Sequence, residues 1–277
     1  MEPQFGRLAL HTWTLETTPL EAALEAAKAG GFDAIELRRS DFRACFDRGM
    51  SNGDVLEVVR ASKLPVACLG VEYGWMFAEG EERRRLFDVF GQSCANAVEL
   101  GCGLIMSAPG QNTGSMEQAI ASTRQAAEMV AAHGLRCAIE FNFQHPLLNS
   151  VEALRELLDG AARPAMGLLL DAYHLTRSGR PGRGFEDVPG EAIFAFQYSD
   201  VPATPVGDVK RPTDRLMPGD GIVEWEAMLG LLAEKGYTGH LSFEAPNPIY
   251  WERPPGEVAA EAVARTRAMV ERVLTVG

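Results

Sequence analysis

Short apolar runs alternate with longer amphipathic stretches along the whole 277-residue chain. The amphipathic stretches place alanine and leucine at helical spacing, and several stop at glycine. Residues 19–32, "PLEAALEAAKAGGF", begin with a proline and end in a Gly-Gly pair. The apolar runs have the length of buried strands. We expect eight strands, at residues 8–11, 34–37, 66–71, 104–107, 136–141, 167–171, 194–199 and 241–244.

The order of these elements is strand then helix, repeated eight times at roughly 35 residues per unit. This alternation predicts a parallel sheet. Eight units predict a closed (β/α)8 TIM barrel of the α/β class, with residues 1–277 as a single domain. The competing fold is an open doubly wound sheet, which favours a glycine-rich turn after the first strand. The first strand instead runs through "LALHTWTLETT", which contains no glycine.

Polar side chains stand near the ends of the last four predicted strands: Glu140, Asp171, Gln197 and Glu244. Side chains alternate along a strand, so the apolar neighbours of Glu140, Gln197 and Glu244 should face the helices, and these three should face the barrel mouth. TIM-barrel active sites lie at this end. Three neighbouring carboxylates cannot all stay ionised without a cation. The pattern therefore favours a divalent metal over separate acids that pair with an arginine or cap a helix.

Two long irregular segments follow the sixth and seventh predicted strands, at residues 175–190 and 201–221. Loops of this length in a compact domain are typical of functional sites. Both follow a strand, so both should lie at the same face as the acids. Arg215 belongs to the second segment and stands beside "LMPGDG".

The chain resembles the xylose isomerase-like sugar isomerase and epimerase barrels, a family that also includes endonuclease IV. The resemblance covers the whole chain. It rests on Glu140, "DAYH" at 171–174, "QYSD" at 197–200, "PGDGIVEW" at 218–225 and "GYTGHLSFE" at 236–244. Each motif alone is weak, but their order and spacing together are specific. The resemblance implies that Glu140, Asp171, Gln197 and Glu244 bind one divalent cation.

Gln197 departs from the family pattern, because most members carry histidine at this position. An amide carbonyl would make the site all-oxygen, and such donors favour Mn²⁺ or Mg²⁺ over Zn²⁺, with Co²⁺ as a further candidate. The set also resembles the 3-dehydroshikimate dehydratase branch, in which Glu-Asp-Gln-Glu holds the metal. Against that branch, the third strand, "ACLGVEYGW", ends without the arginine expected to hold a substrate carboxylate.

Further residues are candidates for catalysis and substrate binding. Glu140 or Glu244 would remove a proton. His174 would act as a general acid or base or as a hydrogen-bond donor, and its alternative is a loop histidine that caps a helix. The candidate substrate-binding residues are Arg215, His145, Glu36, Trp13 and Trp75. Plain packing is the alternative for the last four, and a solvated position is the alternative for Arg215.

A metal ringed by carboxylates suits proton removal next to a carbonyl, which gives an enediolate. Return of the proton to the other face gives an epimer, and return to the neighbouring carbon gives an isomer. We therefore expect an isomerase or epimerase whose partner is a small keto-sugar, cyclitol or related polyol. A dehydratase that expels a β-hydroxyl is the first alternative. A non-catalytic sugar-binding barrel is the second.

Composition disfavours several other classes of protein. The net charge of −12 disfavours nucleic-acid binding. A DNA-repair endonuclease on the same barrel needs several histidine ligands, whereas this chain has five histidines, few of them at strand ends. There is no apolar run of membrane-spanning length, and the five cysteines form no CxxC pair. The first residues have no long apolar run, so we expect no secretory leader. We expect a cytoplasmic protein with reduced cysteines and no membrane partner. A homo-oligomer is compatible with the sequence.

Overall fold

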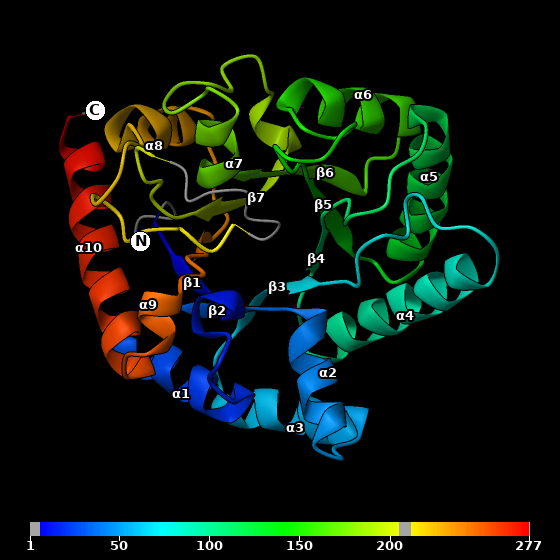
Figure 1. Ribbon diagram of the computed structural model, residues 1–277, viewed down its shortest axis with the longest axis horizontal. Coiled ribbons are helices and arrows are strands. Elements are labelled where there is room, and N and C mark those ends of the chain that lie inside the picture. The colour runs from blue at the N-terminus through cyan, green and yellow to red at the C-terminus, as the bar shows by residue number, and fades with distance from the viewer. Residues whose placement is uncertain (1–5, 205–211, 277) are drawn as a thin grey trace.

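The eight predicted strands exist, and they close into a barrel. The computed structural model describes residues 6–204 and 212–276. All strand pairs are parallel, and the order around the ring follows the chain from β1 to β8, which in turn pairs with β1 (Figure 1). The predicted α/β TIM barrel is confirmed. The strands are β1 Leu8–His11, β2 Ala34–Leu37, β3 Val66–Gly70, β4 Leu104–Ser107, β5 Arg136–Glu140, β6 Met166–Asp171, β7 Ile193–Tyr198 and β8 Leu241–Phe243.

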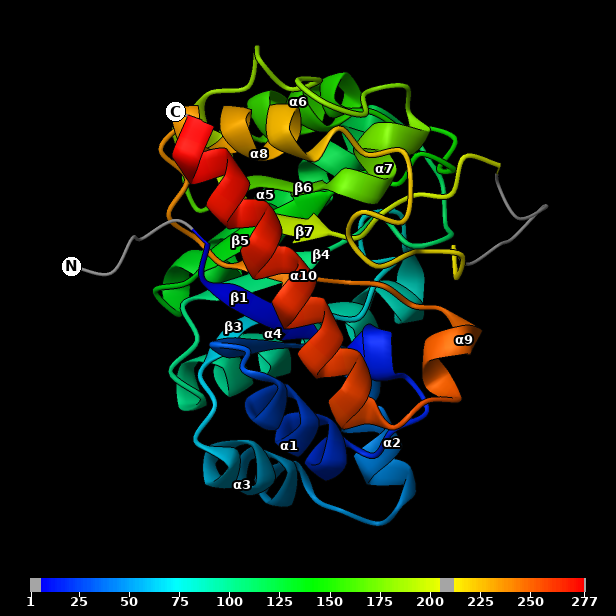
Figure 2. The same ribbon diagram turned by 90° about the vertical axis from the view of Figure 1, so that its left-hand side faces the viewer.

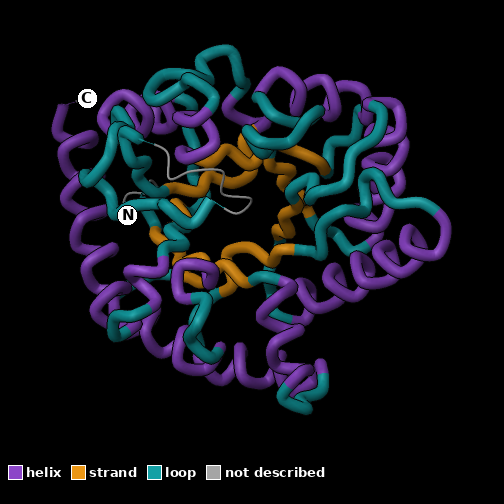
Figure 3. The backbone as a smooth tube through the Cα atoms, in the orientation of Figure 1, coloured by secondary structure: helices purple, strands orange, loops and turns teal. Residues whose placement is uncertain are grey.

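Helices form a layer outside the ring of strands (Figure 3). The last helix, α10, packs against α1 and α8 beside the first strand (Figure 2). The connection between β2 and β3 holds two helices, α2 and α3. The helices are α1 Leu20–Gly30, α2 Arg39–Asp47, α3 Asn52–Ser62, α4 Gly80–Glu99, α5 Met116–Ala132, α6 Val151–Ala161, α7 Ala172–Arg177, α8 Trp225–Glu234, α9 Pro248–Trp251 and α10 Pro255–Val276, with 3-10 turns η1 Thr12–Leu15 and η2 Gly190–Ala192.

Helix ends follow local chemistry. Serine side chains at Ser51, Ser115 and Ser150 accept a backbone N–H in the first turns of α3, α5 and α6, which removes one orphan donor from each helix. Helix α1 ends at Gly31, which takes a left-handed conformation with a φ of 93° that glycine adopts without strain. The chain then turns and enters β2 at Ala34.

The two faces of each strand meet different layers. On β5, Ile139 belongs to the large apolar core between strands and helices, whereas Ala138 belongs to a small cluster inside the barrel. On β7, Tyr198 points outward and its hydroxyl lies 2.8 Å from Thr266 Oγ1 on α10. The alternation predicted from the sequence therefore holds. It turns Glu140 and Gln197 toward the barrel axis.

None of the helices in residues 6–204 and 212–276 combines the length and the apolar character needed to cross a bilayer.

Candidate metal centre and active site

A cavity of about 370 Å³ opens at the carboxyl ends of the strands. Its walls come from segments that are far apart in the chain, which is the usual construction of a TIM-barrel site. The residues that line it are His11, Trp13, Arg38, Arg39, Ser40, Arg43, Val71, Glu72, Tyr73, Ala108, Gly110, Gln111, Glu140, Asn142, His174, Pro212, Arg215 and Glu244.

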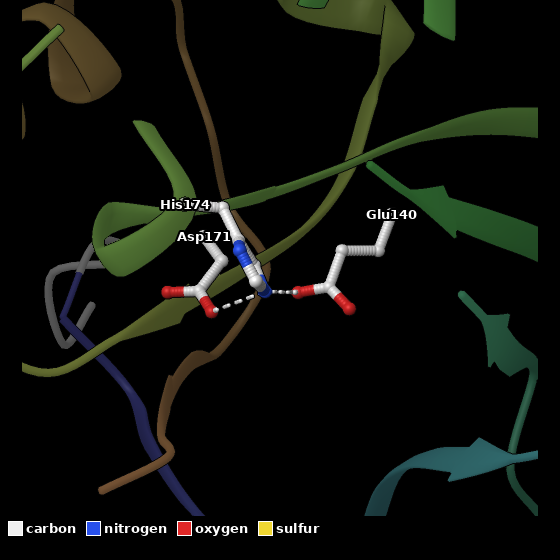
Figure 4. A group of neighbouring side chains, drawn as sticks. All are labelled: Glu140, Asp171 and His174. Atoms are coloured by element: carbon white, nitrogen blue, oxygen red, sulfur yellow. Dashed lines mark ion pairs between the residues drawn. The ribbon is translucent and has the colours of Figure 1, made fainter. Parts of the chain in front are cut away.

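The junction of β6 and α7 places two of the predicted residues. Asp171 ends the strand, and its Oδ1 accepts the Tyr173 N–H at 2.9 Å, so it caps the helix. His174 lies in the first turn of α7, which continues to Arg177 and so occupies the start of the irregular segment predicted for residues 175–190. Its Nε2 lies 3.6 Å from Glu140 Oε1 and 3.9 Å from Asp171 Oδ2 (Figure 4). The three side chains are buried and converge on one point.

The amide of Gln197 is fully buried, with its two ends in different environments. Its Nε2 donates to Glu36 Oε1 at 2.8 Å, while its Oε1 has no hydrogen-bond partner. A buried acceptor left in this state costs about 1–3 kcal/mol. Backbone pairing sets Gln197 level with Asp171 on the neighbouring strand. The unpartnered oxygen thus lies on the same layer of the barrel as a predicted metal ligand.

Arg215 occupies the centre of the acidic group. Its Nη1 lies 2.6 Å from Asp171 Oδ2 and 2.8 Å from Glu244 Oε2, and the side chain is 1% exposed. The guanidinium also lies over the Tyr173 ring, 4.5 Å from its centroid. The other oxygen of Glu244, Oε1, lies 3.2 Å from His11 Nε2. One buried arginine therefore compensates several acids.

The pKa values of three buried glutamates are raised, because burial disfavours their charged forms and the neighbouring acids repel one another. Burial raises the pKa of Glu140 well above its ordinary value, and the nearby Glu244 and Asp171 add to the shift. Burial raises the pKa of Glu244 to about 8 although Arg215 opposes it, and it raises the pKa of Glu36 to about 7. Burial lowers the pKa of His174 to about 4, so this imidazole is neutral near pH 7. A second positive charge at the site would relieve all three carboxyl groups.

The donor atoms fit a divalent cation. Glu140 Oε1 and Gln197 Oε1 are buried acceptors without a hydrogen-bond partner. Asp171 Oδ2 is bonded to a guanidinium that a cation could replace. Ligand atoms of Glu140, Asp171 and His174 all lie within 4.8 Å of one another, which adds an imidazole nitrogen to the predicted set. Carboxylate and carbonyl oxygens suit Mg²⁺ and Mn²⁺, and the imidazole extends the range to Co²⁺ and Zn²⁺.

Of the predicted substrate-binding residues, some line the cavity and others do not. Trp13 and Arg215 line the cavity, with the guanidinium 5.9 Å from a Trp13 ring centroid. Glu36 lies beneath the cavity, behind Gln197, and does not line it. Trp75 is fully buried, packs on Phe87 and Phe90 at 6.0 and 5.4 Å, and donates to Ser107.

His145 also lies outside the cavity lining. Its Nδ1 accepts the N–H groups of Leu147 and Leu148, its Nε2 lies 3.0 Å from Asn112 O, and its ring stacks on Phe77. These contacts use both ring nitrogens and hold the turn after β5. We leave His145 and Trp75 out of the proposed substrate site.

Asp200 is an organising residue that sequence reasoning missed. Its carboxylate accepts N–H groups from Val201, Gly219 and Val223 and the indole N–H of Trp225. It therefore holds the "PGDG" stretch against the end of β7 and fixes the loop segment that carries Arg215. The sequence offered one signal for this role, because "QYSD" and "PGDG" both belong to the motifs on which the family resemblance rests. Residues 205–211 of the same loop lie outside the described residues.

A larger cavity, of about 990 Å³, opens at the opposite, amino ends of the strands. Residues at or just before the starts of strands line its rim, including Arg7, Gly103 and Arg136. Glu36 closes its inner end, but none of the other inward-facing acids reaches it. The convergence of donor atoms thus belongs to the carboxyl end of the barrel.

The chain is similar to known sugar and cyclitol enzymes. It is 24% identical over 267 residues to an inosose isomerase of Bacillus velezensis, covering 94% of this chain and 95% of the relative. It is 28% identical over 267 residues to a 3-dehydroshikimate dehydratase of Pseudomonas aeruginosa, covering 91% of this chain but only 39% of that longer protein.

A solved structure shares the fold. A crystal structure of IolI protein with a bound zinc atom matches with a TM-score of 0.85 at 22% identity, covering 96% of this chain and 99% of that one. The family model described as xylose isomerase-like TIM barrel matches residues 24–269. The resemblance expected from the motifs is thereby confirmed, and the chain belongs to the xylose isomerase-like TIM barrel family.

Proposed function

We propose that this chain is a divalent-metal-dependent enzyme that isomerises or epimerises a keto-sugar or cyclitol next to its carbonyl group. One observation carries the proposal. The buried carboxyl groups of Glu140 and Glu244 line the cavity, and Arg215 links Glu244 to the buried carboxylate of Asp171. Backbone pairing sets Asp171 level with Gln197, whose buried amide oxygen has no hydrogen-bond partner. Such crowded acids are typical of a site that holds a cation and moves protons. The inosose isomerase relative supports the substrate class.

Glu140, Asp171, Gln197 and Glu244 would hold the cation, with His174 as a further donor. Mn²⁺ or Mg²⁺ suits the oxygens, and Co²⁺ suits the set that includes His174. When bound, the cation would polarise the substrate carbonyl and stabilise negative charge on its oxygen.

The proton chemistry falls to Glu140 and Glu244. One carboxylate takes the proton from the carbon next to the carbonyl, and the C–H electron pair moves toward the carbonyl oxygen to give the enediolate. The acids enter from β5 and β8, at separate places on the ring. A proton removed by one can therefore be returned to the other face of the substrate. Arg215 and neutral His174 would orient substrate hydroxyls, and Trp13 would pack against the ring.

Dehydration is the second candidate. It begins with the same proton removal, after which the β C–O bond breaks and the hydroxyl leaves as water. The 3-dehydroshikimate dehydratase relative supports it, as does the Gln197 corner of the donor set. Two arginines in the cavity wall, Arg39 and Arg43, favour it further, because they suit a substrate that carries an acid group.

The test uses protein stripped with a chelator and reloaded with Mn²⁺, Mg²⁺ or Co²⁺. Inososes, keto-sugars and 3-dehydroshikimate are incubated in D₂O and followed by NMR. We expect metal-dependent deuterium incorporation next to the carbonyl of an isomerase substrate, or loss of water and new unsaturated signals for a dehydratase. Binding of these compounds without turnover under any metal would refute both and identify a sugar-binding barrel.

A further inference from the structure

The wall of the cavity beside β2 and β3 is cationic. Arg38, Arg39 and Arg43 all line it, from the junction of β2 and α2 and the first turns of α2. Arg38 is neutralised, since its guanidinium lies 3.1 Å from Asp41 and 3.5 Å from Glu16. Arg39 and Arg43 form no ion pair with any carboxylate in residues 6–204 and 212–276. Arg39 is partly buried and Arg43 is exposed, so two positive charges stand at this wall, without a carboxylate partner among the described residues, in a chain of net charge −12.

Arg39 keeps donors free although it is half-buried. Its Nη2 donates to Gln92 on α4 at 3.1 Å, and the guanidinium packs over Phe46, 5.4 Å from the ring centroid. Its Nε and Nη1 are buried and have no hydrogen-bond partner. Burial lowers the pKa of Arg39, and nearby Arg43 lowers it further. Unpartnered guanidinium N–H groups next to a like charge are costly unless something else binds them.

The acid that faces Arg39 from the neighbouring element is already engaged. Glu72 follows β3 and lines the same wall, and its Oε1 lies 2.6 Å from Arg85 Nη2. Its charge is therefore shared with Arg85. The end of β3 lacks an arginine of its own, as the sequence showed. Helix α2 instead supplies two guanidinium groups to the wall that β3 also forms.

We propose that Arg39 and Arg43 bind an anionic group on the substrate, a carboxylate or a phosphate monoester. The inference rests on the proposed function, because it assigns the substrate class of that same cavity. The guanidinium fork matches the oxygens of both groups. The substrate would then span the cavity, with its acid group toward α2 and its carbonyl toward Glu140, which lines the cavity from β5. Neutral inososes would be poorer ligands than keto acids of similar size.

Calorimetry on the Mn²⁺-loaded protein tests this directly. The probes are shikimate, its neutral methyl ester, sorbitol 6-phosphate and sorbitol. The test variant is the double substitution Arg39→Gln with Arg43→Gln. The matched control is Arg84→Gln, since Arg84 is 75% exposed on α4, pairs with Glu81 and does not line the cavity.

For wild type we expect an anionic probe to bind about 100-fold tighter than its neutral counterpart, or about tenfold per guanidinium. The double variant should lose this preference while its affinity for the neutral probe stays the same, and Arg84→Gln should keep it. The preference should also weaken with added salt in wild type. Shikimate and sorbitol 6-phosphate together decide which acid group the wall accepts.

Equal binding of the charged and neutral members of both pairs by wild type would overturn the inference, as would an unchanged preference in the double variant. The double substitution Arg39→Lys with Arg43→Lys keeps the charge and guards against a folding defect; it should retain part of the preference. Binding is measured without turnover, so this result is independent of the proposed chemistry. A protein that prefers anions but turns over no substrate would refute the function and leave the subsite standing.

Discussion

Replacing Gln197 by leucine tests the metal assignment most sharply, because its two effects on the metal-free protein nearly cancel. The change removes a buried oxygen that has no partner, which stabilises by about 1–3 kcal/mol. It also removes the N–H that Glu36 accepts at 2.8 Å, which costs about the same. We expect the metal-free variant to match wild type within about 1 kcal/mol.

The metal-loaded proteins should differ clearly. Disturbing a metal site typically weakens affinity by up to about 100-fold. At a metal concentration about 1,000 times the wild-type Kd, binding stabilises wild type by about 4 kcal/mol, and a 100-fold weaker variant by about 1.4 kcal/mol. For a chain of this size, each kcal/mol corresponds to about 2 °C in Tm. The metal should raise Tm by about 8 °C in wild type and by about 3 °C in Gln197→Leu.

The assay compares thermal unfolding with chelator and with one fixed concentration of Mn²⁺. Gln111→Leu is the matched control, since Gln111 lines the same cavity but is exposed. Gln197→His should shift the preference toward Co²⁺ and Zn²⁺, because imidazole suits these ions. If Mn²⁺ raises Tm equally in wild type and Gln197→Leu, the amide oxygen is not a ligand.

Three further predictions concern acids. Glu140→Gln and Glu244→Gln each keep the side-chain shape but lose the proton acceptor, so kcat should fall about 10²–10⁴-fold with unchanged circular dichroism; a wild-type kcat contradicts the role. The chelated protein should lose stability as pH rises from about 5 to 8, because folded Glu244, with a pKa of about 8, keeps a proton that the unfolded chain, at 4.5, has released. Glu244 alone accounts for a loss of about 1.4 kcal/mol per pH unit in that window, so Glu244→Gln should remove this contribution from the slope measured by urea unfolding; a slope equal to that of wild type would refute this reasoning. In Asp200→Asn, at least one of the four N–H groups that donate to Asp200 would face the amide NH₂ group, which cannot accept it. We expect the free energy of unfolding to fall by about 3 kcal/mol and Tm by about 6 °C, with the Mn²⁺ response retained. An unchanged Tm would show that these bonds contribute little.

The fold could be predicted from the sequence because parallel barrel strands are buried on both faces and therefore form continuous apolar runs. The structure places every strand within one residue of its expected bounds; for example, β5 ends at Glu140 instead of Phe141. Side-chain alternation then fixed the facing of Glu140, Gln197 and Glu244. These inferences need only local pattern and a period of two.

Features that depend on contacts between distant segments could not be predicted. Arg39 and Arg43 of the cationic wall belong to α2, but they line the cavity beside the residues that follow β3. A search for arginine along the third strand therefore could not find Arg39. Trp75 and His145 follow strands, just as the residues that line the cavity do. Trp75 packs on Phe87 instead of the cavity, and His145 bonds to the turn after β5. Sequence position places a residue near the mouth, but the turn of its own backbone decides which way it points.

The pairing of Gln197 with Glu36 joins residues 161 positions apart, and it explains how glutamine can stand where the family resemblance leads us to expect histidine. A metal-ligating histidine uses one ring nitrogen for the metal and donates the other N–H to a carboxylate or carbonyl, which fixes the ring. Gln197 offers the same two functions, since its N–H group donates to Glu36 and its oxygen is left for a cation. In the proposed metal site, the exchange of histidine for glutamine would therefore keep the supporting carboxylate and replace a nitrogen ligand by an oxygen. It follows that Gln197→His should retain the contact with Glu36 and fold normally, so that a change in metal preference, and not a loss of structure, is its expected effect.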